Sequence, residues 1–374
     1  MKKPSGPAWL EVDLTAIKRN IAATRRLVGP STQVVVVVKA NAYGHGLVQV
    51  GKAAEDACAD GLAVALVEEG RQLREAGISI PILVLGSIPV GQAADAIESD
   101  LTCALCDPGL AEALSSSAVK LQRPARVEIK IDTGMGRIGL QPDELPAFLD
   151  RCDHLAGLQV KGVFSHLSCA EATDPSYSKL QYERFAGTKR KIGNQRPESR
   201  KWRWHLASSA AAAYLPECRL DGVRIGLLTY GLNPVAHLVP LRLEPVACWK
   251  TRITYMKDCP AGSSISYGRT YITSRPTRIA TLGAGYADGY PRALSNRGEV
   301  LLGGRRTPIA GTVCMDQMMI EIPADMPASV GDEVVLMGSQ GTETITTQEL
   351  ADRAGAVMHE ILARLGARLE RVYL

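Results

Sequence analysis

Lys39 directly follows the most regular apolar segment of the chain, the five consecutive valines at positions 34–38. Five β-branched residues in a row predict a strand that is buried on both faces, as in a parallel sheet. A lysine at the carboxyl end of such a strand lies where α/β barrels and doubly wound sheets carry out their chemistry. Its amine can bond to a carbonyl group, although a lone strand-end lysine most often only reaches solvent. A functional role for Lys39 therefore depends on which other groups converge on it.

Further candidate side chains follow or end other expected strands. Most of them are basic, and in chain order they are Lys130, Arg137, His166, His205, Ser209 and Arg224. The glycines of the segment KIDTGMGRIG let the chain turn sharply, so that Arg137 returns over the ends of the strands. We expect both histidines and both arginines of this set to point into one barrel mouth.

Ser209 and the peptide groups of Gly226 and Leu227 follow the seventh and eighth expected strands. The corresponding loops of α/β barrels commonly hold a phosphate group on backbone N–H groups. The expected mouth therefore contains a lysine, several cations and a phosphate cradle, but no cluster of metal-binding carboxylates. This combination points to a phosphorylated carbonyl cofactor held as a Schiff base, namely pyridoxal phosphate.

Short apolar segments alternate with helical patterns between residues 30 and 235. The expected strands are 34–38, 62–65, 82–86, 102–105, 126–131, 158–164, 202–206 and 222–225. Helical patterns between them include 68–76, 108–114, 143–150 and 175–192. Eight strands alternating with helices predict a (β/α)8 barrel of the TIM type, because a doubly wound sheet needs fewer strands and a switch point.

The pattern changes to mostly strands after Pro240, so we expect a barrel domain over residues 1–240 and a second, mostly β domain over residues 241–374. The expected strands of the second domain are 246–256, 277–282, 299–302, 317–322, 333–337 and a last strand within 367–374. One helix is expected over 347–354, with Thr346 or Thr347 as its N-cap. Residues 9–14 also alternate, and this first segment can pair with the second domain.

Composition narrows the class of protein. The chain has 374 residues, 46% hydrophobic residues, 22% charged residues and a net charge of +4, which are typical of a soluble globular protein. The basic residues form no stripe with interleaved aromatic residues, which disfavours nucleic-acid binding. No signal peptide and no membrane-spanning segment are expected. The nine cysteines are irregularly spaced and predict reduced thiols in the cytoplasm, and the pair Cys103 and Cys106 is not expected to bind metal.

Seven segments in chain order resemble those of bacterial alanine racemases. They are VVVVVKANAYGHG, KIDTGMGRIG, SHLS, VRIGLLTYG, ISYGRTY, GAGYADGY and GTVCMDQ. The resemblance extends from about residue 8 to residue 374. It implies a pyridoxal phosphate barrel followed by a β domain, assembled as a head-to-tail homodimer. It also implies interconversion of L-alanine and D-alanine, which supplies D-alanine for peptidoglycan.

The resemblance also implies roles for individual residues. Lys39 matches the Schiff-base lysine, which is one of two catalytic bases, and Tyr267 matches the opposite base, contributed by the partner subunit. The residues matched to cofactor contacts are Tyr43, His166, Ser209, Arg224, Gly226, Leu227 and His359. The residues matched to substrate contacts are Arg137, Tyr286 and Met315. Lys130 matches a lysine that is often carbamylated in this family, and no metal is implied.

The expected reaction explains why these residue types are needed. Racemisation removes the α-proton from one face of the substrate and returns a proton to the other, so one base is needed on each side. Arg224 matches the arginine that faces the pyridine nitrogen of the cofactor. Because arginine stays protonated, it holds that nitrogen unprotonated, which weakens the electron sink and limits transamination.

One position departs from the family pattern and leaves the substrate partly open. His359 stands where the family usually has a tyrosine that touches the phosphate and shapes the pocket. A broad-specificity racemase, acting for example on serine, is therefore the first alternative to alanine. An amino-acid decarboxylase would lack the Arg224 and Tyr267 pair, a non-catalytic cofactor carrier is usually a barrel alone, and a barrel hydrolase would need paired carboxylates or a metal triad.

Overall fold

A computed structural model describes residues 4–374, and the chain divides into two compact units. The barrel unit consists of residues 15–42 and 47–244. Among the described residues, the β unit consists of 4–14, 43–46 and 245–374. No helix among the described residues is both long enough and apolar enough to cross a membrane.

The barrel unit is built on eight parallel strands that close on themselves. In sheet order they are β2 (Gln33–Val37), β3 (Gly61–Val64), β4 (Ile82–Val84), β5 (Thr102–Leu105), β6 (Ala125–Lys130), β7 (Leu158–Phe164), β8 (Arg203–His205) and β9 (Gly222–Ile225). The predicted (β/α)8 barrel is confirmed, and each strand lies within one or two residues of its predicted segment. Residues 34–38 are buried, as expected for a strand covered on both sides.

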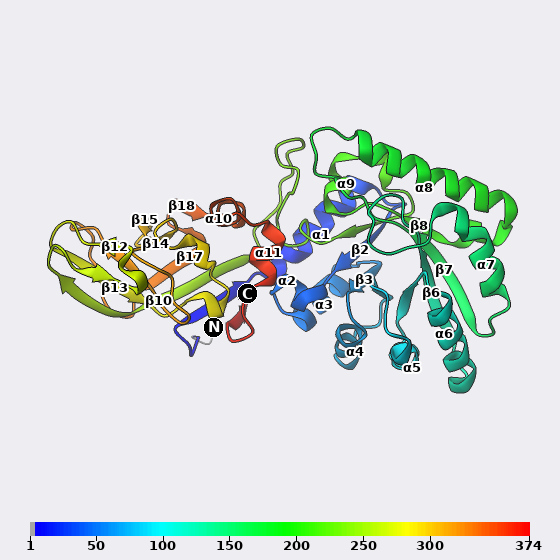
Figure 1. Ribbon diagram of the computed structural model, residues 1–374, viewed down its shortest axis with the longest axis horizontal. Coiled ribbons are helices and arrows are strands. Elements are labelled where there is room, and N and C mark those ends of the chain that lie inside the picture. Colours follow the sequence, from blue (N-terminus) through cyan, green and yellow to red (C-terminus); the bar gives the residue numbers. More distant parts are fainter. Residues whose placement is uncertain (1–3) are drawn as a thin grey trace. The chain divides into compact units, whose positions relative to one another are not determined.

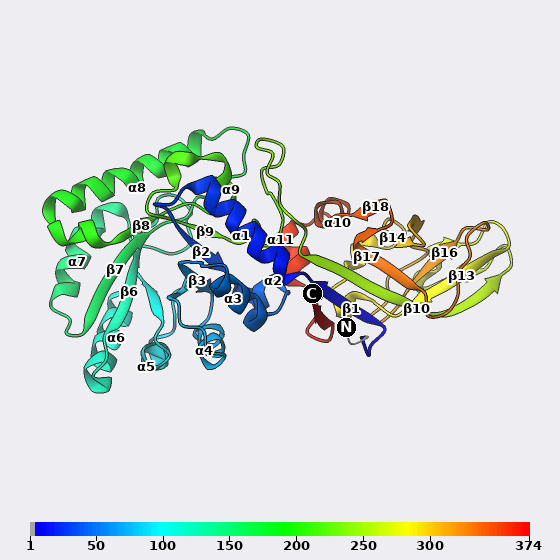
Figure 2. The same cartoon turned by 180° about the vertical axis from the view of Figure 1, so that it is seen from behind.

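Helices surround the barrel strands (Figure 1). They are α1 (Leu14–Val28), α3 (Leu47–Asp56), α4 (Val67–Glu75), α5 (Ala93–Glu98), α6 (Pro108–Leu121), α7 (Leu145–Asp153), α8 (Ser176–Gln195) and α9 (Ser209–Tyr214). Figure 2 shows α1 and α8 outside the strands from the opposite side. Local sequence fixes helix starts: the Asp107 side chain caps α6 by accepting from the Leu110 N–H at 2.7 Å, with Pro108 at the first helical position.

The β unit contains a nine-stranded sheet. Its main path runs β15 (Arg305–Pro308), β14 (Glu299–Leu302), β17 (Glu333–Gln340), β10 (Ala247–Cys259), β1 (Ala8–Val12) and β19 (Glu370–Tyr373). The strands β13 (Thr277–Leu282), β16 (Met318–Ile322) and β18 (Glu343–Ile345) pair off this path, and β11 (Ser264–Ile265) pairs with β12 (Tyr271–Ile272). Strand β1 is antiparallel to β10 and parallel to β19, so the start and the end of the chain share one sheet.

Two helices complete the β unit, α10 (Thr347–Ala354) and α11 (Met358–Ala363). The predicted cap of the first is confirmed, because Thr346 Oγ1 accepts a hydrogen bond from the Glu349 N–H at 3.0 Å. Gly355 then ends the helix in the left-handed region, at φ 67°.

Candidate active site

Lys39 begins a turn with an unusual backbone. Ala40, Asn41 and Ala42 lie in the left-handed helical region, with φ of 54°, 54° and 53°. Each non-glycine residue in this region costs about 1–2 kcal/mol. The turn is held by hydrogen bonds on its barrel side: the Ala42 N–H donates to the Val38 carbonyl at 2.8 Å, and Asn41 Oδ1 accepts from the Leu47 N–H at 2.9 Å. Backbone strain of this kind concentrates at functional sites.

Glu69 lies in the first turn of α4 and connects the turn after Lys39 to the segment that follows β3. Its Oε1 accepts from the Ala40 N–H at 2.6 Å, and its Oε2 accepts from the N–H groups of Ala65 and Leu66 at 2.8 and 3.2 Å. One carboxylate therefore joins the chain after β2 to the chain after β3, beside Lys39. Glu69 was not predicted as a site residue, because a glutamate in the first turn is common on any helix.

Burial and neighbouring charges change the pKa of the Lys39 amine. Burial lowers its pKa, and the cations of Arg137 and Arg224 lower it further, while Glu69 acts in the opposite direction. A lower pKa raises the fraction of neutral amine, which is the form that attacks a carbonyl group and that accepts a proton.

Arg224 on β9 is buried, and its guanidinium is almost fully engaged. Its Nη1 donates to His205 Nδ1 at 2.7 Å, and its Nη2 donates to the Ser165 carbonyl at 2.7 Å and to His166 Nδ1 at 3.2 Å. No residue within 4–374 accepts a hydrogen bond from its Nε–H. Burial lowers the pKa of Arg224 to about 10, so the side chain is still charged at neutral pH.

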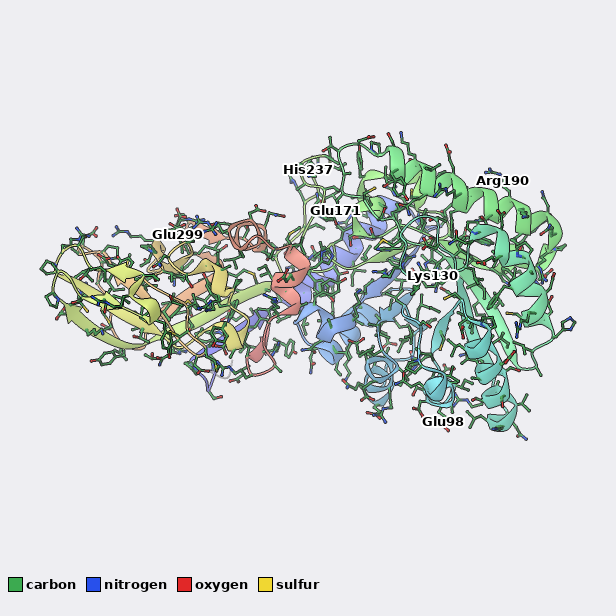
Figure 3. The ribbon with its side chains drawn as sticks, viewed as in Figure 1. Glu98, Lys130, Glu171, Arg190, His237 and Glu299 are labelled. Atoms are coloured by element: carbon green, nitrogen blue, oxygen red, sulfur yellow. The ribbon has the colours of Figure 1, made fainter. Side chains whose placement is uncertain are left out.

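His166 and Lys130 share this cationic environment. Burial lowers the pKa of His166 well below its usual value, and Arg224, Lys130 and Arg137 add to the effect. Burial also lowers the pKa of Lys130, followed by Arg224 and Arg137. The Lys130 Nζ lies 4.4 Å from the centre of the Phe164 ring. Figure 3 shows Lys130 among the barrel strands.

Arg137 is exposed at the end of the glycine-containing loop after β6. The loop is shaped by Asp132, whose carboxylate accepts from the N–H groups of Gly134, Met135 and Gly136 at 2.8–3.2 Å. Glycine is required further along the loop, because a Cβ at Gly139 would lie 2.6 Å from the Asp132 nitrogen.

At the predicted phosphate cradle, one backbone N–H group already has an acceptor among the described residues and another has none. Ser209 Oγ accepts a hydrogen bond from the Gly226 N–H at 2.9 Å, so its hydroxyl hydrogen points elsewhere. The Leu227 residue is 1% exposed, and among the described residues nothing accepts from its N–H. A buried backbone donor without a partner is rare in folded proteins and suits an anionic ligand.

His205 differs from the expectation that it would face the barrel mouth. It is 1% exposed, its ring stacks on Phe164 at 5.1 Å, and its Nε2 lies 2.7 Å from Glu128 Oε2. Glu128, its hydrogen-bond partner, was not among the predicted site residues. Its only sequence signal is a carboxylate within an apolar strand segment, at a position that must be buried.

The remaining predicted site residues lie in the β unit. Tyr267, Met315 and Tyr286 are 72%, 52% and 41% exposed. A hydrogen bond joins the loops that carry Met315 and Tyr286, because the Ala287 N–H donates to the Met315 carbonyl at 2.9 Å. Tyr43 is buried, with its ring centre 5.8 Å from that of His359.

The fold and these groups define a class of protein. A closed α/β barrel with a lysine of lowered pKa, a buried arginine and a buried backbone N–H without an acceptor near its strand ends is typical of barrel enzymes, whose active sites lie at the carboxyl-terminal mouth. No group of three or more potential metal ligands occurs among residues 4–374.

Comparison with known proteins gives the family. The alanine racemase N-terminal domain model matches residues 12–234, and the alanine racemase C-terminal domain model matches residues 246–373. The alanine racemase of Symbiobacterium thermophilum is 48% identical over 98% of this chain and 97% of that protein. The alanine racemase of Halothermothrix orenii is 41% identical over 100% of this chain and 98% of that protein.

Solved structures agree with these matches. Alanine racemase from a D-cycloserine-producing Streptomyces lavendulae has a TM-score of 0.94 at 35% identity, over 100% of this chain and 98% of that one. Alanine racemase from Bacillus anthracis with bound L-Ala-P has a TM-score of 0.93 at 35% identity, over 100% of this chain and 96% of that one. The chain belongs to the alanine racemase family.

Proposed function

We propose that this chain interconverts L-alanine and D-alanine with pyridoxal phosphate held on Lys39. The observation that carries the proposal is the Lys39 amine at the end of β2, with its pKa lowered by burial and by two arginines. Full-length relatives named alanine racemase support the reaction, and the named L-Ala-P complex of one of them supports alanine as the substrate.

The residues of the barrel unit fit a phosphorylated pyridine. The Leu227 N–H and the Ser209 hydroxyl are donors suited to the phosphate, and the Gly226 N–H holds the Ser209 oxygen in place by donating to it. The Arg224 Nε–H is the donor of its guanidinium that remains for a ring nitrogen. When bound, pyridoxal phosphate supplies the electron sink that makes the α-proton of the amino acid removable.

The chain's own residues then move and guide the protons. Lys39 accepts the α-proton on one face, and its lowered pKa favours the neutral form that this step needs. Tyr267 of the partner subunit serves the opposite face. Arg224 donates to the ring nitrogen without giving up its proton, since its pKa stays at about 10 even when buried.

Other roles follow the resemblance. Arg137, together with Tyr286 and Met315 of the partner subunit, contacts the substrate. Lys130 is nearly buried among cations with a strongly lowered pKa, and a neutral amine is the form that reacts with carbon dioxide to give a carbamate. A carbamate there would bring a negative charge close to Arg137.

A head-to-tail homodimer completes each site in this proposal. The exposure of Tyr267, Met315 and Tyr286 supports it, because large apolar side chains exposed together commonly mark an interface. We place the enzyme in the cytoplasm, where it would supply D-alanine for peptidoglycan. All nine cysteines are free, which fits a reducing compartment.

Broad specificity is the second candidate, and one observation favours it. His359 occupies the position next to Tyr43 where a tyrosine is usual, and it is the smaller side chain. Tyr43 and His359 are proposed phosphate contacts, so a smaller group there alters the wall of the substrate pocket. Serine is then the amino acid to compare with alanine.

Borohydride trapping tests the cofactor and its position together. The purified protein should be yellow, and reduction should fix the cofactor on the peptide containing Lys39, as read by mass spectrometry. The Lys39→Ala protein should trap none, whereas Lys52→Ala, an exposed lysine on α3, should trap as much as the wild type. A colourless protein that racemises alanine without added pyridoxal phosphate would refute the proposal.

A further inference from the structure

A buried polar chain crosses four neighbouring strands of the barrel and ends at Arg224. Glu128 on β6 bonds to His205 on β8, with 2.7 Å between Oε2 and Nε2. Arg224 on β9 then donates to His205 Nδ1, also at 2.7 Å. All three side chains are almost inaccessible to solvent, so none of these bonds competes with water.

Glycine on the intervening strand makes the contact from β6 to β8 possible. A Cβ at Gly162 on β7 would lie 2.5 Å from the Arg203 carbonyl oxygen and 3.2 Å from the Glu128 carboxylate. The Glu128 side chain therefore extends across a position that only glycine leaves open. The second oxygen, Oε1, accepts from Arg203 Nε and Nη2 at 3.1 and 2.5 Å.

The contacts fix the direction of every proton in this chain of bonds. A guanidinium can only donate, so His205 Nδ1 must be an acceptor and carries no hydrogen. The hydrogen of the neutral imidazole is therefore on Nε2, where it donates to Glu128. Glu128 is the acceptor that holds His205 in the one tautomer that can accept from Arg224.

The same contacts determine which N–H group of Arg224 has no acceptor among residues 4–374 and so remains available to a ligand. The Nη1 group also donates to the His205 carbonyl at 3.3 Å, and Nη2 is shared among the carbonyls of Ser165 and Leu206 and the His166 ring. Because the guanidinium is planar, the His205 bond and these carbonyls hold its whole plane against rotation about the Cδ–Nε bond. What is left toward a ligand is the Nε–H.

We propose that Glu128 and His205 are positioning residues for Arg224: Glu128 fixes the tautomer of His205, and His205 fixes the guanidinium so that Nε–H faces the cofactor ring. The proposal rests on the proposed function, in which Arg224 suppresses protonation of the ring nitrogen. Glu128 is also the counter-charge in a region that otherwise contains Arg203, Arg224 and Lys130. Loss of either positioning residue should thus change which reaction is catalysed, in addition to its rate.

The first test does not involve activity. The chain has six histidines, so two-bond 1H–15N correlation of histidine-labelled enzyme gives at most six imidazole patterns, and the His205→Gln protein identifies the one of His205. The wild-type pattern should be that of a neutral ring with hydrogen on Nε2. A ring with hydrogen on Nδ1, or a charged ring at pH 7, would overturn the proposal.

The second test measures the ratio of transamination to racemisation in the holoenzyme. His205→Leu removes both ring bonds and Glu128→Gln removes the charge, and each should raise this ratio by about tenfold, the effect of one charge-assisted hydrogen bond. His205→Gln should stay near the wild-type ratio, because its amide oxygen can accept from Arg224 while its NH2 donates to Glu128.

Two controls separate positioning from general damage. Val163→Ala truncates a fully buried side chain on β7 outside this polar chain, so it should lower stability and leave the ratio unchanged. In an Arg224→Glu background, His205→Leu should add nothing, because the group that it positions is gone. Unchanged ratios in both Glu128→Gln and His205→Leu would overturn the proposal. If the His205→Leu protein does not fold, the ratio of transamination to racemisation in Glu128→Gln is compared with that in His205→Gln, which tests the same role.

Failure of the proposed function would look different. A wild-type protein that binds no pyridoxal phosphate or racemises no amino acid would refute the function, whatever the state of His205. A wild-type racemase whose ratio ignores Glu128 and His205 would refute only the positioning role.

Discussion

Acidification should destabilise the barrel through His205. Burial lowers the pKa of this histidine to about 4, although Glu128 acts to raise it, whereas an unfolded histidine has a pKa near 6.5. Between these two values the unfolded chain binds a proton that the folded chain does not. The free energy of unfolding therefore falls as the pH falls from 6.5 towards 4.

The size of the effect follows from the two pKa values. Each pH unit within this window is worth about 1.4 kcal/mol, so His205 alone removes about 2 kcal/mol between pH 7 and pH 5, and about 3 kcal/mol by pH 4. Folded Glu128 does not titrate between pH 7 and pH 5, so it contributes little to this change in stability. Burial works to raise its pKa, but His205 and Arg203 outweigh burial and lower the pKa to about 2, so its contribution is lost only below about pH 4.5.

His205→Gln isolates this contribution, because it keeps an acceptor for Arg224 and a donor for Glu128 but cannot titrate. Urea unfolding of the apoprotein at pH 7 and pH 5, at one protein concentration, gives the loss of stability for each protein. The wild type should lose about 2 kcal/mol more than the variant. Other groups, including His166, are present in both proteins and cancel. Equal losses, or a His205 resonance that titrates near pH 6.5, would refute the reasoning.

Three further predictions address the proposed roles. Arg224→Glu should let the ring nitrogen protonate and raise transamination relative to racemisation, and unchanged partitioning measured by product analysis would exclude that role. His359→Tyr should restore the usual pocket wall and favour alanine over serine, so an identical ratio of the two rates would show that His359 does not face the substrate. The Lys39→Ala and Tyr267→Phe proteins should each be inactive alone. Co-expression should recover activity in proportion to the amount of heterodimer, because one of the two sites in each mixed dimer has both bases. Inactive heterodimers would contradict the shared site.

The barrel was predictable because its signal is periodic and repeated. Eight apolar segments alternate with helical patterns, and most of their residues are buried, although the first half of β7 is partly exposed. The short strands 305–308 and 343–345 of the β unit were missed. They contain several polar residues, and their pairing with neighbouring strands defines them more than their own sequence does.

The site was predictable only where residue type and strand end coincide. Lys39 and Arg224 satisfy that rule and were predicted as site residues. The left-handed turn after Lys39 was not, because Ala40 and Ala42 have no local preference for positive φ, and the turn depends on contacts such as that of Glu69 with the Ala40 N–H. Glu128 and His205 were not recognised as partners, since a contact across an intervening strand depends on how the barrel closes.

The carboxylates of the candidate site support the proposal of an anionic ligand. Glu69 accepts from three backbone N–H groups, Asp132 accepts from three others, and Glu128 is shared between Arg203 and His205. Each acid is thus committed to the scaffold. Burial lowers the pKa values of Lys39, Lys130 and His166, and the cations of Arg137 and Arg224 lower them further, so these positive groups lie close to one another. The proposed ligand, which has a phosphate and a carboxylate, would relieve this repulsion, so the same cations that lower the pKa of Lys39 would also draw that ligand to it.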